Sequence, residues 1–120
     1  MKRALALAAL TVAALALVST AVAGPTKAEQ ARGYGGWFSA KTAGHLRDVR
    51  IVRGVAFIDF DNFAGDIPNA STSCGSALLL AQLDRTAKQF STVTRTVYSF
   101  NGSRHAFYEW QQREPPEAWR

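Results

Sequence analysis

The side chains best suited to covalent chemistry in this 120-residue chain are Cys74, its only cysteine, and His105. Cys74 stands near the start of a predicted helix, where the helix dipole favours the reactive thiolate. A catalytic thiol also needs a base within hydrogen-bond reach and a third group that orients the base. Because His105 lies in a different predicted element, the preferred interpretation of Cys74 is a small residue that fills a tight helix entry.

Three carboxylates and one amide concentrate at the end of a predicted strand and just after it: Asp59, Asp61, Asp66 and Asn62. A calcium-binding EF-hand loop would need glycine at its sixth position and glutamate at its twelfth. Counted from Asp59, these positions hold Ala64 and Ala70. The stretch is therefore interpreted as a strand end followed by a polar loop, and the sequence predicts no metal and no cofactor.

The first residues form a targeting segment. Lys2 and Arg3 precede an apolar run from Ala4 to Val18, and Ala21-Val22-Ala23 fits the small-residue pattern that signal peptidase cleaves. Residues 1–23 are therefore predicted to be a signal peptide. The mature protein would begin at Gly24, be secreted to the cell envelope and carry no stable membrane span.

A retained transmembrane anchor is the alternative for the same segment. A spanning helix needs about 20 strongly apolar residues, whereas this run is rich in alanine and ends at Ser19 and Thr20. Cleavage is therefore the favoured interpretation. The 14 Lys and Arg residues against 9 Asp and Glu make the chain basic, but they are scattered along the sequence, which argues against a nucleic-acid partner.

The remaining sequence predicts alternating helices and strands. Thr26 and Glu29 have the spacing of a capping box at a helix start. An alternating and then continuously apolar stretch from His45 to Phe60 predicts two strands joined at Arg53-Gly54. The later predicted elements are a helix over Cys74 to Phe90, a strand over Thr92 to Phe100, a hairpin turn at Asn101-Gly102 and a return strand over Arg104 to Trp110.

These elements predict an α+β (α/β) fold. It has a small single sheet of about four strands with two helices packed on it, in the order β-hairpin, helix, β-hairpin, and it contains a β-α-β unit. The predicted domain covers residues 24–112, and residues 113–120, which include Pro115-Pro116, form an extended tail.

Several ordered stretches make the chain resemble the GerMN domain family. They are Gly24-Pro25-Thr26 with Glu29, Leu46-Arg47-Asp48-Val49, Gly54-Val55-Ala56-Phe57-Ile58-Asp59-Phe60, Ser76 to Thr86 (SALLLAQLDRT), Gln89 to Val93 and Tyr98 to Gly102. The resemblance implies a bacterial cell-envelope module of the kind named from spore-germination and sporulation proteins. It also implies an assembly role without catalysis.

The chain departs from the family at its start. Full-length members carry a strand and an apolar helix before the "GPT" segment, and here the helix position is occupied by Ala14 to Ala23. Either the signal peptide has replaced the first elements, or this run is itself the first helix. Cleavage would leave a sheet edge without its neighbour, which is a site for a partner strand or for oligomerisation.

The predicted function is therefore a non-enzymatic envelope module that binds a protein or a cell-wall component. The candidate partner contacts are Phe107, Tyr108 and Trp110, because aromatic residues are enriched at binding hot spots. In a strand, Phe107 would face one side while Tyr108 and Trp110 faced the other. The alternative function is a small secreted hydrolase or thiol-dependent protein that uses Cys74.

Cleavage at the predicted site has a direct test. Secreted protein should begin at Gly24, and N-terminal sequencing of material from the culture medium checks this. Intact chain that stays in the membrane fraction after high-salt extraction would instead support the anchor.

Overall fold

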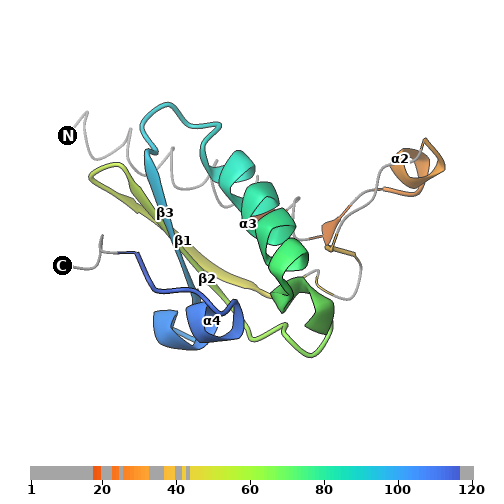
Figure 1. The fold of residues 1–120 in the computed structure, drawn as a ribbon. Helices are drawn as coiled ribbons and strands as arrows, with labels where there is room; N and C mark the ends of the chain where they lie inside the picture. Colours follow the sequence, from red (N-terminus) through yellow and green to blue (C-terminus); the bar gives the residue numbers. More distant parts are fainter. Residues whose placement is uncertain are drawn as a thin grey trace.

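The computed structural model describes residues 18–19, 23–24, 26–32, 37–39, 42 and 44–116. Most of the predicted signal peptide, the glycines at 33, 35 and 36, and residues 117–120 of the predicted tail lie outside this part of the chain. The described part is a three-stranded sheet with helices packed against it (Figure 1). This confirms the α+β class with one strand fewer than predicted.

The sheet has the order β1-β2-β3, with β1 at Leu46–Val52, β2 at Val55–Phe60 and β3 at Arg95–Phe100. β1 and β2 are antiparallel, and β2 and β3 are parallel. Arg53 and Gly54 both have positive φ, at 50° and 80°, which is the backbone of a type I′ hairpin turn. The first hairpin and the β-α-β unit are therefore confirmed.

The main helix, α3, runs over Ser73–Ala87, shorter at its end than the predicted Cys74 to Phe90. Thr72 is its N-cap, and its Oγ1 accepts a hydrogen bond from the Gly75 backbone N–H at 3.2 Å. A side chain at Gly75 would clash with the Asn69 carbonyl oxygen. The absence of that side chain lets the short 3-10 helix η1 (Pro68–Ser71) pack against the first turn of α3.

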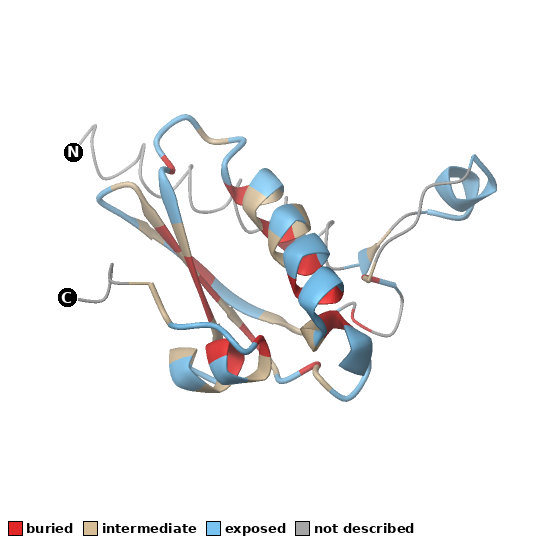
Figure 2. Cartoon of the chain, viewed as in Figure 1, coloured by how far each residue is buried: buried red, intermediate tan, exposed pale blue. Residues whose placement is uncertain are grey.

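One face of α3 packs onto the sheet, and Figure 2 shows buried positions recurring along that face. The spacing follows the helical period of 3.6 residues. The buried residues of this helix are Gly75, Ser76, Leu79, Leu83 and Ala87. The predicted apolar face is confirmed for Leu79, Leu83 and Ala87, whereas Phe90 lies in the turn that follows the helix.

The predicted return strand is wrong, because residues Arg104–Trp110 form a helix, α4. The turn itself is present, since Asn101 and Gly102 have φ of 49° and 82°. A hairpin starts there with a single bridge between Phe100 and Ser103 and goes no further. Ser103 Oγ then accepts a hydrogen bond from the Ala106 backbone N–H at 3.1 Å and caps the helix instead.

The described N-terminal residues add two observations. α2 (Lys27–Ala31) has Thr26 as its N-cap, and Thr26 and Glu29 form the predicted capping box. Val18 is helical and only 2% exposed, so one side chain of the apolar run belongs to the core of this chain. Within the described residues, no helix combines the length and the apolar character needed to cross a membrane.

Leu83 is 1% exposed at the centre of the α3 face, so the Leu83→Ala variant loses buried contacts and leaves a cavity. We expect a loss of about 2–5 kcal/mol in the free energy of unfolding, measured by urea denaturation. Leu78→Ala is the matched control, because Leu78 lies on the same helix but is 59% exposed. Equal effects of the two changes would show that the face is assigned wrongly.

Candidate functional site

The three predicted contact residues lie on α4, and two of them are in the core. Phe107 is 0% exposed and Tyr108 is 4% exposed. Trp110 is half-buried, with its ring 5.4 Å from that of Phe100 and 5.9 Å from that of Phe63. The expected alternation of faces fails because it assumed a strand. In this structure Phe107 and Tyr108 are core residues, whereas Trp110 packs against the core and keeps part of its surface accessible.

α4 also closes the outer edge of β3. The Arg95 N–H donates to the Gly54 carbonyl and the Asn101 N–H donates to the Phe60 carbonyl, both on the β2 side. The backbone N–H and C=O groups of the even-numbered residues between them therefore point away from β2. The Tyr98 N–H donates to Tyr108 Oη at 3.1 Å, and the Phe100 N–H donates to the Ser103 carbonyl at 3.0 Å. A partner strand therefore finds two of the donors at this edge already occupied.

The outer edge of β1 is different, because no described strand pairs with it. A two-residue type I′ turn makes Val52 and Val55 a hydrogen-bonded pair, and antiparallel pairs then alternate along the ladder. Arg50 with Phe57 is the next bonded pair in the register of the two strands. The backbone groups of Val49 and Ile51 consequently point away from β2, toward the open edge.

A carboxylate links α3 to β3. Asp84 Oδ1 accepts hydrogen bonds from Tyr98 Oη at 2.5 Å and from Thr96 Oγ1 at 2.7 Å. Burial raises the pKa of Tyr98 well above its usual value, and the nearby Asp84 charge raises it further. Burial also raises the pKa of Tyr108 to about 12. Both phenols are therefore protonated at neutral pH and act as hydrogen-bonding groups of the core.

The predicted acidic stretch meets basic and polar partners at the carboxyl ends of β2 and β3 and in the loop that follows β2. Asp59 accepts a hydrogen bond from Ser99 Oγ at 2.6 Å and forms an ion pair with Arg47 at 3.3 Å. Asp66 lies 3.1 Å from Nε2 of His45. These partners leave the carboxylates engaged, and the described residues contain no group of three or more His, Cys, Asp or Glu placed to hold a metal ion.

The two residues considered for thiol chemistry lie on different helices. Cys74 is an exposed free thiol in the first turn of α3. His105 lies on α4, and its Nε2 is 3.3 Å from the Glu109 carboxylate one helical turn away. Among the described residues no hydrogen bond joins Cys74 to His105, so the geometry does not pair this thiol with this imidazole.

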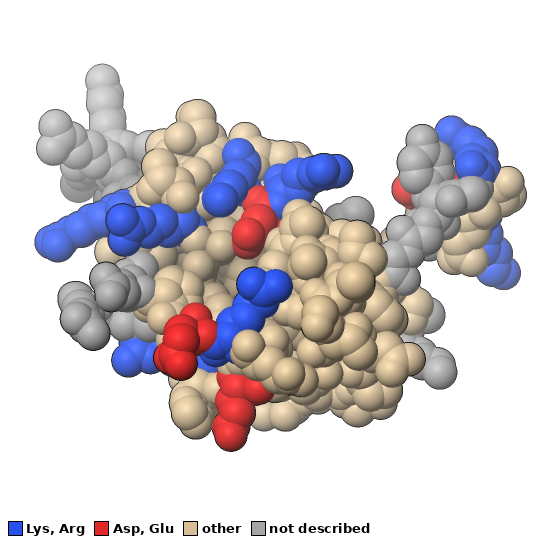
Figure 3. All heavy atoms as spheres, viewed as in Figure 1, with Lys and Arg blue, Asp and Glu red and all other residues tan. Residues whose placement is uncertain are grey.

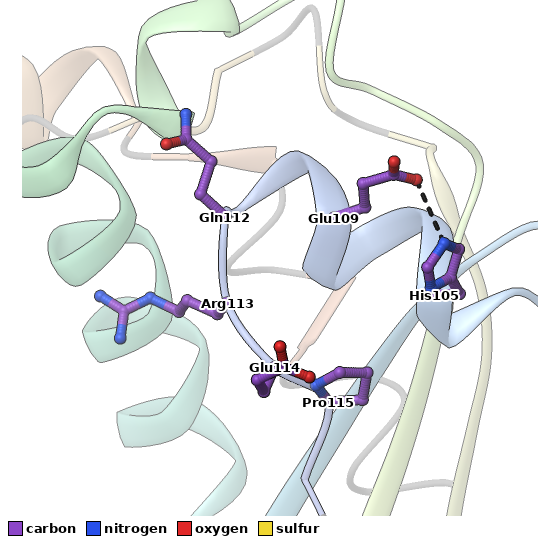
Figure 4. A pocket seen from close by; sticks show the side chains of 6 residues that line it. All are labelled: His105, Glu109, Gln112, Arg113, Glu114 and Pro115. Atoms are coloured by element: carbon purple, nitrogen blue, oxygen red, sulfur yellow. Dashed lines mark ion pairs between the residues drawn. The ribbon is translucent and has the colours of Figure 1, made fainter.

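A pocket of about 360 Å³ lies between α4 and the segment that follows it. Figure 4 shows its lining side chains, which are His105, Glu109, Gln112, Arg113, Glu114 and Pro115. Arg113 points toward α3, where its Nε donates to Ser76 Oγ at 2.8 Å. This contact, which the sequence analysis missed, attaches the beginning of the predicted tail to the domain.

Comparisons of the chain with protein-family models, curated proteins and solved structures find no match. The functional argument for this protein therefore depends on the surfaces of the fold.

The raised tyrosine pKa values predict a loss of stability in alkali. In the unfolded chain a phenol ionises near pH 10. In the folded chain the pKa of Tyr108 is about 12, and the pKa of Tyr98 is also raised well above its usual value. Unfolding therefore releases protons above pH 10, and the free energy of unfolding should fall as the pH rises from there, by about 1.4 kcal/mol per pH unit for each phenol.

Urea denaturation between pH 8 and pH 12 measures this slope. Tyr108→Phe removes one of the two phenols and should make the fall less steep, while its effect at pH 8 reports the lost hydrogen bond to the Tyr98 N–H. A variant with the wild-type slope would contradict the assignment.

Proposed function

We propose that this protein is a non-enzymatic, exported module of the cell envelope that binds a protein partner through the open edge of β1. The observation that carries the proposal is the asymmetry of the sheet. One edge is occupied by α4 and its turn, whereas the other presents the backbone groups of Val49 and Ile51 with no described strand beside them. The partner is an extended segment of an envelope protein that adds a strand to the sheet.

Strand addition suits this edge for two reasons. Main-chain hydrogen bonds supply affinity, and the side chains flanking the edge supply selectivity. Exposed side chains of both signs lie on β1, namely Arg47, Asp48 and Arg50. Charged side chains on an edge strand oppose indiscriminate aggregation, so the edge favours a partner with a matching charge pattern. The resemblance to GerMN domains also supports an assembly role.

A proline substitution at the open edge tests the proposal. Proline has no backbone N–H and is tolerated in strands where that group faces away from the sheet. Ile51→Pro should therefore keep the β1–β2 ladder and remove one donor needed by an added strand. We expect capture of envelope proteins by the immobilised chain to fall at least about tenfold, which corresponds to about 1.4 kcal/mol.

The matched control is Ile51→Ala, which removes most of the same half-buried side chain but keeps the N–H. Circular dichroism and urea denaturation on both variants separate loss of folding from loss of binding. The proposal requires that only the proline variant loses the partner. Equal capture by two folded variants would remove the edge of β1 from the binding surface.

A further inference from the structure

Basic side chains that are scattered along the sequence converge at one end of the fold. The turn between β1 and β2 lies beside the start of β3, because the Gly54 carbonyl accepts the Thr94 N–H at 2.8 Å and the Arg95 N–H at 3.2 Å. The end of α3 lies over the same strand, because Asp84 bonds to Thr96. The basic end, as we call this surface, comprises Arg50, Arg53, Arg85, Lys88 and Arg95, all exposed.

These five charges have little compensation. Residues 48–58 and 82–97 contain two carboxylates. Asp48 is exposed on β1, and Asp84 faces the sheet and accepts hydrogen bonds from Tyr98 and Thr96. None of the five basic residues forms an ion pair with a carboxylate in the described part of the chain. Figure 3 shows Lys and Arg side chains gathered over the hairpin tip and the C-terminal end of α3.

An exposed apolar side chain lies beside the charges of the hairpin tip, next to Arg53 in the chain and two residues from Arg50. Val52 precedes Arg53 at the hairpin tip and is 42% exposed, one of two large hydrophobic side chains of the described chain with such exposure. The basic side chains alone would bind any polymer of phosphate groups. An exposed apolar tip flanked by basic residues also gains from contact with the acyl boundary of a bilayer, and this favours a lipid surface over a soluble polymer.

We infer that the basic end is a docking surface for a bilayer that carries anionic phospholipid head groups. The guanidinium and ammonium groups contact lipid phosphates, and Val52 enters the interfacial layer. Each basic residue near an anionic membrane raises the partition coefficient of the protein from water onto that membrane roughly fivefold. The basic end shares Arg50 with the edge of β1. The variants below change only Arg53, Arg95 and Val52, so their test stays distinguishable from that of the proposed protein partner.

The experiment measures partition of the full chain onto vesicles of phosphatidylcholine with and without phosphatidylglycerol. The double variant Arg53→Asn with Arg95→Gln removes two charges, and asparagine tolerates the positive φ of residue 53. We expect its partition onto the anionic vesicles to fall roughly 25-fold. Raising the salt from about 0.1 M to about 1 M, which shortens the Debye length from about 10 Å to about 3 Å, should weaken the wild type similarly.

The matched control is Lys27→Gln with Arg32→Gln, which removes two exposed charges from α2 and its C-cap, far from the hairpin tip (Figure 1). It should bind as the wild type does. Equal partition of the wild type onto neutral and anionic vesicles, or an unchanged double variant, would overturn the inference.

A further variant separates the bilayer from a soluble phosphate polymer. Val52→Thr keeps the shape of the side chain and should weaken vesicle binding without changing binding to inorganic polyphosphate. Equal loss in both assays, or no loss on vesicles, would overturn the assignment to a lipid surface.

Discussion

The packing of aromatic rings around Phe100 is the interaction on which the other elements depend. The Phe100 ring lies 5.1 Å from that of Phe63 and 5.0 Å from that of Phe107, so one strand, one loop and one helix meet at a single point. The chain has one cysteine and hence no internal disulfide. Burial of these rings, each with a large apolar area, must therefore stabilise a small sheet in which the structure describes three strands.

The same packing explains which elements could be predicted from the sequence. The first hairpin, α3 and the parallel pairing of β2 with β3 follow from local patterns, namely a two-residue turn, a helical period and a β-α-β order. The segment from Arg104 to Trp110 has no such decisive local pattern. The helix formed by this segment places Phe107 against Tyr98 and Phe100. This tertiary contact determines the structure of the segment, and it cannot be seen in the local sequence.

The candidate surfaces were less predictable for a related reason. Tyr108 looks like an interface residue in the sequence because of its type, yet its hydroxyl caps a backbone N–H of β3 in the core. The basic end joins residues up to 45 positions apart, and only the contacts of Gly54 with Arg95 and of Asp84 with Thr96 bring them together. The sequence shows the chemical type of each side chain. Whether a partner can reach that side chain depends on its neighbours in the fold.

The occupied outer edge of β3 limits how copies of this protein can combine. Two chains can pair β1 with β1 in an antiparallel manner about a twofold axis, which would give a continuous six-stranded sheet. The outer strands of that sheet would both be β3, whose outward donors at Tyr98 and Phe100 are already bonded within each chain. Growth would therefore stop at two subunits, so self-association through this sheet would give a closed symmetric pair and not a filament.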